Sequence, residues 1–127
     1  MAWTFRDFVT DRGENVIKEW LDGLPDKKAK AKINALLSHL EAESLLRPPE
    51  VKKIVGFDGI YEVCLVRQNT QYRPLGCYGP GETEFSLLVG AIERGDRITP
   101  PSAFQTAVDR RRLIQGGRSA TCEHDFS

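Results

Sequence analysis

The sequence predicts an α+β domain, a small antiparallel sheet with an amino-terminal helical hairpin packed on it and a carboxyl-terminal helix. Three observations carry this prediction. Apolar residues follow a helical period over residues 12–40, β-branched and aromatic residues dominate residues 51–92, and Thr99-Pro100-Pro101 opens another helical pattern. The chain of 127 residues has the length of a single domain. We assign that domain to residues 1–115 and expect residues 116–127 to form a flexible tail.

Residues 3–9 alternate between apolar and polar side chains and predict a first strand. A helix is expected from about residue 12, because Asp11 and Glu14 have the spacing of a capping box. Its apolar positions recur at helical spacing and are Ile17, Trp20, Leu21 and Leu24. Asp26 is the expected cap of a second helix, so the two helices form a hairpin with a tight loop.

Four runs rich in β-branched and aromatic residues follow, separated by short turn sequences. These runs are residues 51–57, 60–67, 70–78 and 84–92. Short turns between successive strands predict an antiparallel meander. Pro74 has no N–H to donate to a strand ladder, so we expect a bulge or bend there, near Gly76.

The last helix is expected to begin with Thr99 as its cap and Pro100 at its first position, and to end at Gly116. No apolar run reaches the roughly 18 to 20 residues that span a bilayer, and the amino terminus lacks the pattern of a signal peptide. We therefore expect a cytoplasmic protein. Its three cysteines lack the spacing of a zinc site or a disulfide framework and are expected to be reduced thiols, and we expect no cofactor or metal.

The charges balance overall but not locally. Lysine plus arginine and aspartate plus glutamate number 18 each, so affinity for a polyanion must come from local placement of charge. Residues 27–53 hold seven basic and three acidic groups, and residues 94–118 hold six and two. These segments predict either solvated helix faces or a patch that contacts phosphate, for which the arginine fork is suited.

Several short motifs occur in a characteristic order. They are Glu19-Trp20-Leu21-x-x-Leu24, Gly59-Ile60-Tyr61-Glu62-Val63, Tyr72-Arg73, the apolar run from Phe85 to Ala91, and Thr99-Pro100-Pro101 followed by Ala107. With these motifs, residues 3–114 resemble the RelE/ParE superfamily of bacterial type II toxins, in particular the phage-derived Gp49-like, HigB-type branch.

The resemblance implies a RelE-like fold, an antitoxin partner of the helix-turn-helix, HigA-like type, and cleavage of mRNA on the ribosome in active members. In that metal-free reaction the ribose 2′-hydroxyl attacks the adjacent phosphate, a base removes its proton, and cationic side chains stabilise the developing charge. The residues that we expect to be catalytic are Arg73, Arg94, Arg97 and Tyr78. Those that we expect to bind RNA are Arg67, Lys52, Lys53 and Arg111.

The residues that act as general base and general acid are left unassigned, because arginine is a poor proton donor. The candidates are Tyr61, Tyr72 and Tyr78 as hydroxyls, and Glu62 and Glu93 as carboxylates. His124 would join the site only if the tail folded back, as in some HigB-like toxins. Two other functions also stay open: a ParE-like inhibitor of DNA gyrase, and an inactive phage-related binding or regulatory module. The mixture of acids and arginines in residues 91–97 favours the inactive module.

Overall fold

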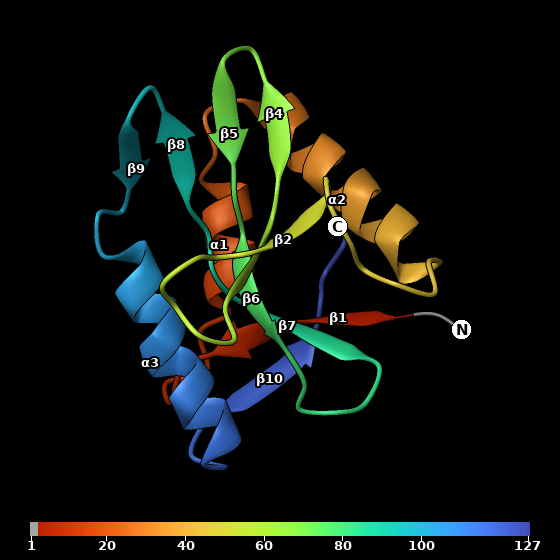
Figure 1. Cartoon of the computed structure of the whole chain (residues 1–127), viewed down its shortest axis with the longest axis vertical. Helices are drawn as coiled ribbons and strands as arrows, with labels where there is room; N and C mark the ends of the chain where they lie inside the picture. Colours follow the sequence, from red (N-terminus) through yellow and green to blue (C-terminus); the bar gives the residue numbers. More distant parts are fainter. Residues whose placement is uncertain (1–2) are drawn as a thin grey trace.

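The computed structural model describes residues 3–127, which form an α+β structure of three helices and two β-sheets (Figure 1). The helices are α1 (Val16–Asp22), α2 (Lys27–Glu41) and α3 (Ala103–Gln115). The strands are β1 (Thr4–Val9), β2 (Val51–Lys53), β3 (Tyr61–Val63), β4 (Leu65–Arg67), β5 (Thr70–Tyr72), β6 (Leu75–Tyr78), β7 (Glu84–Val89), β8 (Ile92–Arg94), β9 (Arg97–Thr99) and β10 (Ala120–Glu123). The α+β class predicted from the sequence is confirmed.

The larger sheet is mixed, with the strand order β10-β1-β7-β6-β3-β2. Strands β2, β3, β6 and β7 pair antiparallel with one another, as the short turns predict. Strand β1, however, lies between β7 and β10 and runs parallel to β7. The predicted purely antiparallel meander is therefore wrong. Parallel strands are joined by long crossovers, so no local turn sequence signals their pairing.

Two of the predicted strands divide where they pass from the larger sheet into a second one. Residues 60–67 form β3 and β4, and residues 70–78 form β5 and β6. The second sheet is antiparallel, with the order β4-β5-β8-β9, and it stands upright at the top of Figure 1. Pro74 lies at the division of the later run, and the register shifts between Leu75 and Gly76. The predicted bulge near Gly76 is confirmed.

The amino-terminal helices begin at side-chain caps, one of which the sequence predicts correctly. Asp26 caps α2 by accepting the backbone N–H of Lys28. Helix α1 begins later than expected, because Asn15 and not Asp11 caps it, accepting two backbone N–H groups of the first turn. Residues 10–14 instead form a tight loop, closed by hydrogen bonds between Thr10 and Glu14.

Helix α3 begins after Ser102, which makes no side-chain cap hydrogen bond. The predicted cap at Thr99 and first position at Pro100 are therefore wrong. Thr99 belongs to β9, and its extended pairing with β8 takes its backbone out of the helix. The predicted end at Gly116 is confirmed. None of the helices within residues 3–127 has the length and apolarity needed to cross a membrane.

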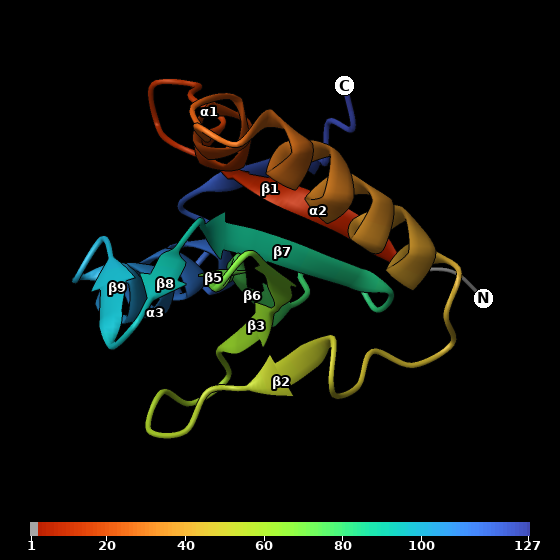
Figure 2. The ribbon, with the colours of Figure 1, turned by 90° about the horizontal axis from the view of Figure 1, so that it is seen from above.

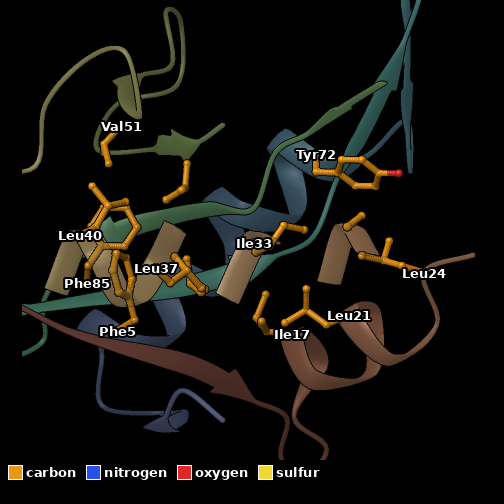
Figure 3. Close-up of a cluster of buried hydrophobic side chains, with 13 residues drawn as sticks. Phe5, Ile17, Leu21, Leu24, Ile33, Leu37, Leu40, Val51, Tyr72 and Phe85 are labelled. Atoms are coloured by element: carbon orange, nitrogen blue, oxygen red, sulfur yellow. The ribbon is translucent and has the colours of Figure 1, made fainter. Parts of the chain in front are cut away.

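Two apolar cores lie on opposite faces of the larger sheet. Helices α1 and α2 cover one face and α3 covers the other (Figure 2). The first core, drawn in Figure 3, joins Phe5 of β1 and Leu37 of α2 to Phe85 of β7. Leu88, also on β7, belongs to the second core. Because β7 is covered on both faces, its residues from Phe85 to Val89 are all buried and do not alternate between buried and exposed.

Gly90, directly after β7, contacts the indole ring of Trp20 on α1. A Cβ atom at position 90 would overlap that ring, so a glycine is needed for α1 to approach the sheet this closely. Two of the motifs found in the sequence therefore meet in the fold.

The carboxyl-terminal residues are ordered. Residues 120–123 form β10, which pairs antiparallel with β1 and places Arg6 opposite Glu123. His124 follows and is 6% exposed. The flexible tail expected for residues 116–127 is therefore not observed, because β1 offers an edge with which the last residues complete the sheet.

Candidate functional site

A row of polar side chains crosses the second sheet at the end where its hairpins turn. Arg67 on β4 lies opposite Thr70 on β5, Thr70 lies opposite Arg94 on β8, and Arg94 lies opposite Arg97 on β9. Residues directly opposite each other in a sheet project from the same face. The four residues, which we call the arginine row, therefore place three guanidinium groups on one face.

Three members of the arginine row, Thr70, Arg94 and Arg97, form one side of a pocket of about 440 Å³. A second row, two residues further along each strand, supplies Tyr72, Ile92 and Thr99. Pro25 and Asp26, from the connection between α1 and α2, line the opposite side. The pocket thus has an apolar floor, a cationic rim and one carboxylate.

Two arginines of the rim are free of carboxylates. Arg94 donates from Nε and Nη2 to the hydroxyl oxygen of Thr70, both at 3.1 Å. The salt bridges formed within residues 3–127 include none to Arg94 or Arg97. Both side chains are exposed, so they can meet an anion without first breaking an ion pair.

The third arginine of the row is already paired. Arg67 donates from Nε to Oδ2 of Asp26 at 2.7 Å. This hydrogen bond is the main cause that lowers the pKa of Asp26, against the opposing effect of burial. Asp26 is therefore a carboxylate at neutral pH, fixed between Arg67 and the amino end of α2.

Arg73, the first catalytic candidate from the sequence, does not line this pocket. Its guanidinium makes a two-pronged contact with Glu62, at 2.7 and 2.9 Å, and also donates to Glu93. Burial disfavours the charged form, but the hydrogen bonds and charges of Glu62 and Glu93 outweigh it and raise the pKa of Arg73. The Arg73 side chain is only 14% exposed, so its donors hold two carboxylates together and are not turned toward solvent.

Tyr78 lies in an aromatic cluster away from the arginine row. Its ring contacts Trp3, Tyr61 and Phe85, with centroid distances of 4.9 to 5.3 Å. Burial and the neighbouring Tyr61 raise the pKa of the Tyr78 hydroxyl. The structure therefore separates Tyr78 from Arg94 and Arg97, with which the sequence analysis grouped it.

The predicted RNA-binding residues are dispersed. Arg67 belongs to the arginine row, whereas Lys52 and Lys53 are exposed on β2, an edge strand of the larger sheet. Arg111 lies on α3 against Gly59, whose φ of +75° and missing side chain leave room for the guanidinium. It lines a separate pocket of about 370 Å³. Of the residues expected to act on RNA, the structure brings together Arg67, Arg94 and Arg97.

His124 forms a buried network that excludes it from the pocket. Its Nδ1 lies 2.8 Å from Oδ1 of Asp7, and its Nε2 lies 2.7 Å from Oδ1 of Asn34. Asn34 in turn donates to the carbonyl oxygen of Phe126. The tail does fold back, but it seals His124 between β1 and α2, where a substrate cannot reach it.

Sequence reasoning missed the pocket roles of Thr70, Thr99 and Asp26. Asp26 was recognisable as a helix cap, but nothing local indicates that it faces Arg67, 41 residues away. Successive residues of a strand point to opposite faces, so the sequence could have predicted that Tyr72 and Arg73 do not share a site. Within residues 3–127, no group of three or more His, Cys, Asp or Glu side chains is arranged to hold a metal ion.

Comparison with known proteins gives no relative from which a role could be transferred: no family model, no curated protein and no solved structure matches this chain.

Proposed function

We propose that this protein is the toxin of a type II toxin-antitoxin system, a RelE/HigB-like endoribonuclease that cleaves mRNA on the ribosome. The observation that carries the proposal is the pocket rimmed by Arg94 and Arg97, whose guanidinium groups have no carboxylate partner among the described residues. A phosphodiester entering the pocket would neutralise them. Cleavage of translated mRNA places the protein in the cytoplasm, with the ribosome and an antitoxin of the HigA-like type as its partners.

The contact between Trp20 and Gly90 joins two of the motifs on which the resemblance rests. The two residues come from motifs about 70 positions apart in the sequence. The order and spacing of the motifs carry the resemblance, and the fold places these two motifs in contact. The helical hairpin lying on the sheet is also compatible with a RelE-like arrangement (Figure 2).

In the proposed reaction the 2′-oxygen forms a bond to phosphorus, and the bond from phosphorus to the 5′-oxygen of the next nucleotide breaks. Arg94 and Arg97 stabilise the charge on the phosphorane oxygens. Asp26 is the carboxylate that lines the pocket and accepts the 2′-proton, while the Tyr72 hydroxyl donates to the leaving 5′-oxygen. Because the pKa of Asp26 is lowered, it is a weak base, and cleavage by this chain should be slow.

A second function is favoured by a different observation. No histidine lines the pocket, and Glu62 and Glu93 occupy the guanidinium of Arg73. A phage-related module that binds RNA phosphates without cutting them would need only the arginine row. The endoribonuclease and the binding module therefore make different predictions: the first cleaves the message, and the second leaves it intact.

The test is induced expression in a bacterial host without a cognate antitoxin, followed by growth curves and primer extension on a translated message. The variant Arg94→Gln with Arg97→Gln is compared with Arg12→Gln and Lys32→Gln, which remove the same charge from exposed side chains outside the pocket. We expect growth arrest and codon-phased cuts in the wild type and the control, and neither in the pocket variant.

Other outcomes separate the alternatives. An intact message with RNA binding that depends on the two arginines would replace the enzyme with the binding module. DNA-damage signalling with an intact message would indicate gyrase inhibition. Cuts that persist in the pocket variant would refute the assignment of the site.

A further inference from the structure

We infer that the pocket holds one unpaired nucleotide, with its base on the apolar floor and its phosphate on Arg94 and Arg97. This inference rests on the proposed role of the arginine row in binding phosphate and names the ligand that the pocket takes. It goes beyond phosphate binding because it assigns a function to the floor and predicts a preference for single-stranded RNA.

The size of the pocket is the first argument. A volume of about 440 Å³ falls within the range of small-molecule sites and is far larger than a phosphate group requires. An anion bound only by the rim would leave the apolar floor exposed to water. A ligand that fills the pocket therefore carries an apolar body as well as a negative charge.

The floor is the second argument. Tyr72 and Ile92 lie opposite each other on β5 and β8, and Pro25 faces them from the helical connection. In Figure 3 the hydroxyl group of Tyr72 points away from the core that its ring helps to cover. A nucleobase would find aromatic and aliphatic surface here, and such stacking tolerates any base.

The spacing of the two rows is the third argument. Arg94 and Ile92 lie two residues apart on β8 and face the same side, which separates them by about 7 Å. A nucleotide holds its base and its phosphate apart by one sugar, so both ends can be engaged at once. Thr70 holds the Arg94 side chain through two hydrogen bonds, so this part of the rim is organised before the ligand arrives.

Two further polar groups that line the pocket suit the sugar. Thr99 contributes a hydroxyl group and Asp26 a carboxylate, both of which can accept from ribose hydroxyls. A base within a duplex is stacked and paired, and must be extruded before it can enter a pocket. Single-stranded RNA avoids that cost, so it should bind better than a duplex of the same sequence.

The experiment is isothermal titration calorimetry on the full chain with adenosine 5′-monophosphate, inorganic phosphate and adenosine. We expect the nucleotide to bind at least tenfold more tightly than either phosphate or adenosine. Thr99→Trp, which fills the floor, should reduce nucleotide affinity to that of phosphate. Arg97→Gln should weaken both. Thr83→Trp, at an exposed loop position, is the matched control and should bind as the wild type does.

Thermal unfolding checks that each variant is folded, and Thr99→Leu replaces Thr99→Trp if the larger side chain prevents folding. Equal affinity for nucleotide and phosphate in the wild type would overturn the inference, even if the protein cleaves mRNA. Nucleotide binding lost in Thr99→Trp, in a protein that leaves mRNA intact, would support the inference and refute the proposed cleavage. Competition between single-stranded and duplex RNA tests the strand preference, and equal competition would also overturn it.

Discussion

The carboxylate of Asp26 lies 2.7 Å from Nε of Arg67, so the residue that caps α2 also neutralises one end of the arginine row. Only Arg94 and Arg97 are therefore left to meet an incoming phosphate without competition from this carboxylate. Asp26 therefore sets the charge of the pocket while it holds the helical hairpin against the second sheet.

Asp26→Asn should raise the affinity of the pocket for phosphate about threefold, since a half-exposed ion pair contributes modestly to binding or stability. Asparagine caps helices as well as aspartate does, so the helix should remain intact. Calorimetric titration with inorganic phosphate measures the change. Asp22→Asn removes the same charge from an exposed carboxylate paired with Lys18 and Lys30, and should have little effect. Equal gains in both variants would mean that general charge, not Asp26, controls affinity.

Arg73→Met should destabilise the fold by about 3 kcal/mol, because it leaves Glu62 and Glu93 partly buried without a cation. Urea unfolding of the wild type and the variant measures the difference. Adding Glu62→Gln to Arg73→Met should recover part of the loss, because one of the two stranded charges is gone. A fully stable Arg73→Met protein with lost RNA binding would instead make Arg73 a phosphate ligand.

His124→Ala should lower the free energy of unfolding by about 2 kcal/mol and make the last residues sensitive to protease. The reason is that Asp7 and Asn34 would each lose a buried hydrogen-bond partner. His39→Ala, an exposed histidine on α2, is the control and should change neither property. If His124→Ala behaved like His39→Ala, the carboxyl-terminal residues would be the loose tail that the sequence suggested.

Cys77 should make the protein less stable as the pH rises into the alkaline range. Burial raises the pKa of its thiol to about 11, well above that of an unfolded cysteine. At a pH between these two pKa values, the Cys77 thiol therefore stays protonated in the native state but is ionised in the unfolded chain. This contribution is constant at neutral pH and is lost as the pH rises from about 8.5 toward 11. Urea unfolding at pH 7 to 10.5 should show the decline, and Cys77→Ala should reduce its slope; an unchanged slope would assign the decline to other groups.

Local features of the fold could be predicted because their causes lie within a few residues of one another. The period of apolar residues places the first two helices, Asp26 caps α2, Gly116 ends α3, and Pro74 brings a bulge near Gly76. Helix α1 begins later than predicted because Asn15, and not Asp11, caps it. Asn15 also donates to Asp7, which fixes it as the cap.

Only part of the site could be predicted from the sequence. The arginines were recognisable as phosphate-binding side chains, but which of them meet depends on the register between strands of two separate hairpins. Arg73 follows β5 and is held by Glu62 and Glu93, two carboxylates that only the fold brings to it.

By itself, the sequence determined the α+β class, the start of α2, the end of α3 and the supply of cationic side chains. The tertiary structure decided the parallel pairing of β1 with β7, the strand at the carboxyl end, and the pocket that brings Asp26 together with Arg94 and Arg97. The physical reason is the range of the interactions. Helix periodicity and caps act within one or two turns, whereas pairing between distant strands and ion pairs across 41 residues depend on how the whole core is buried.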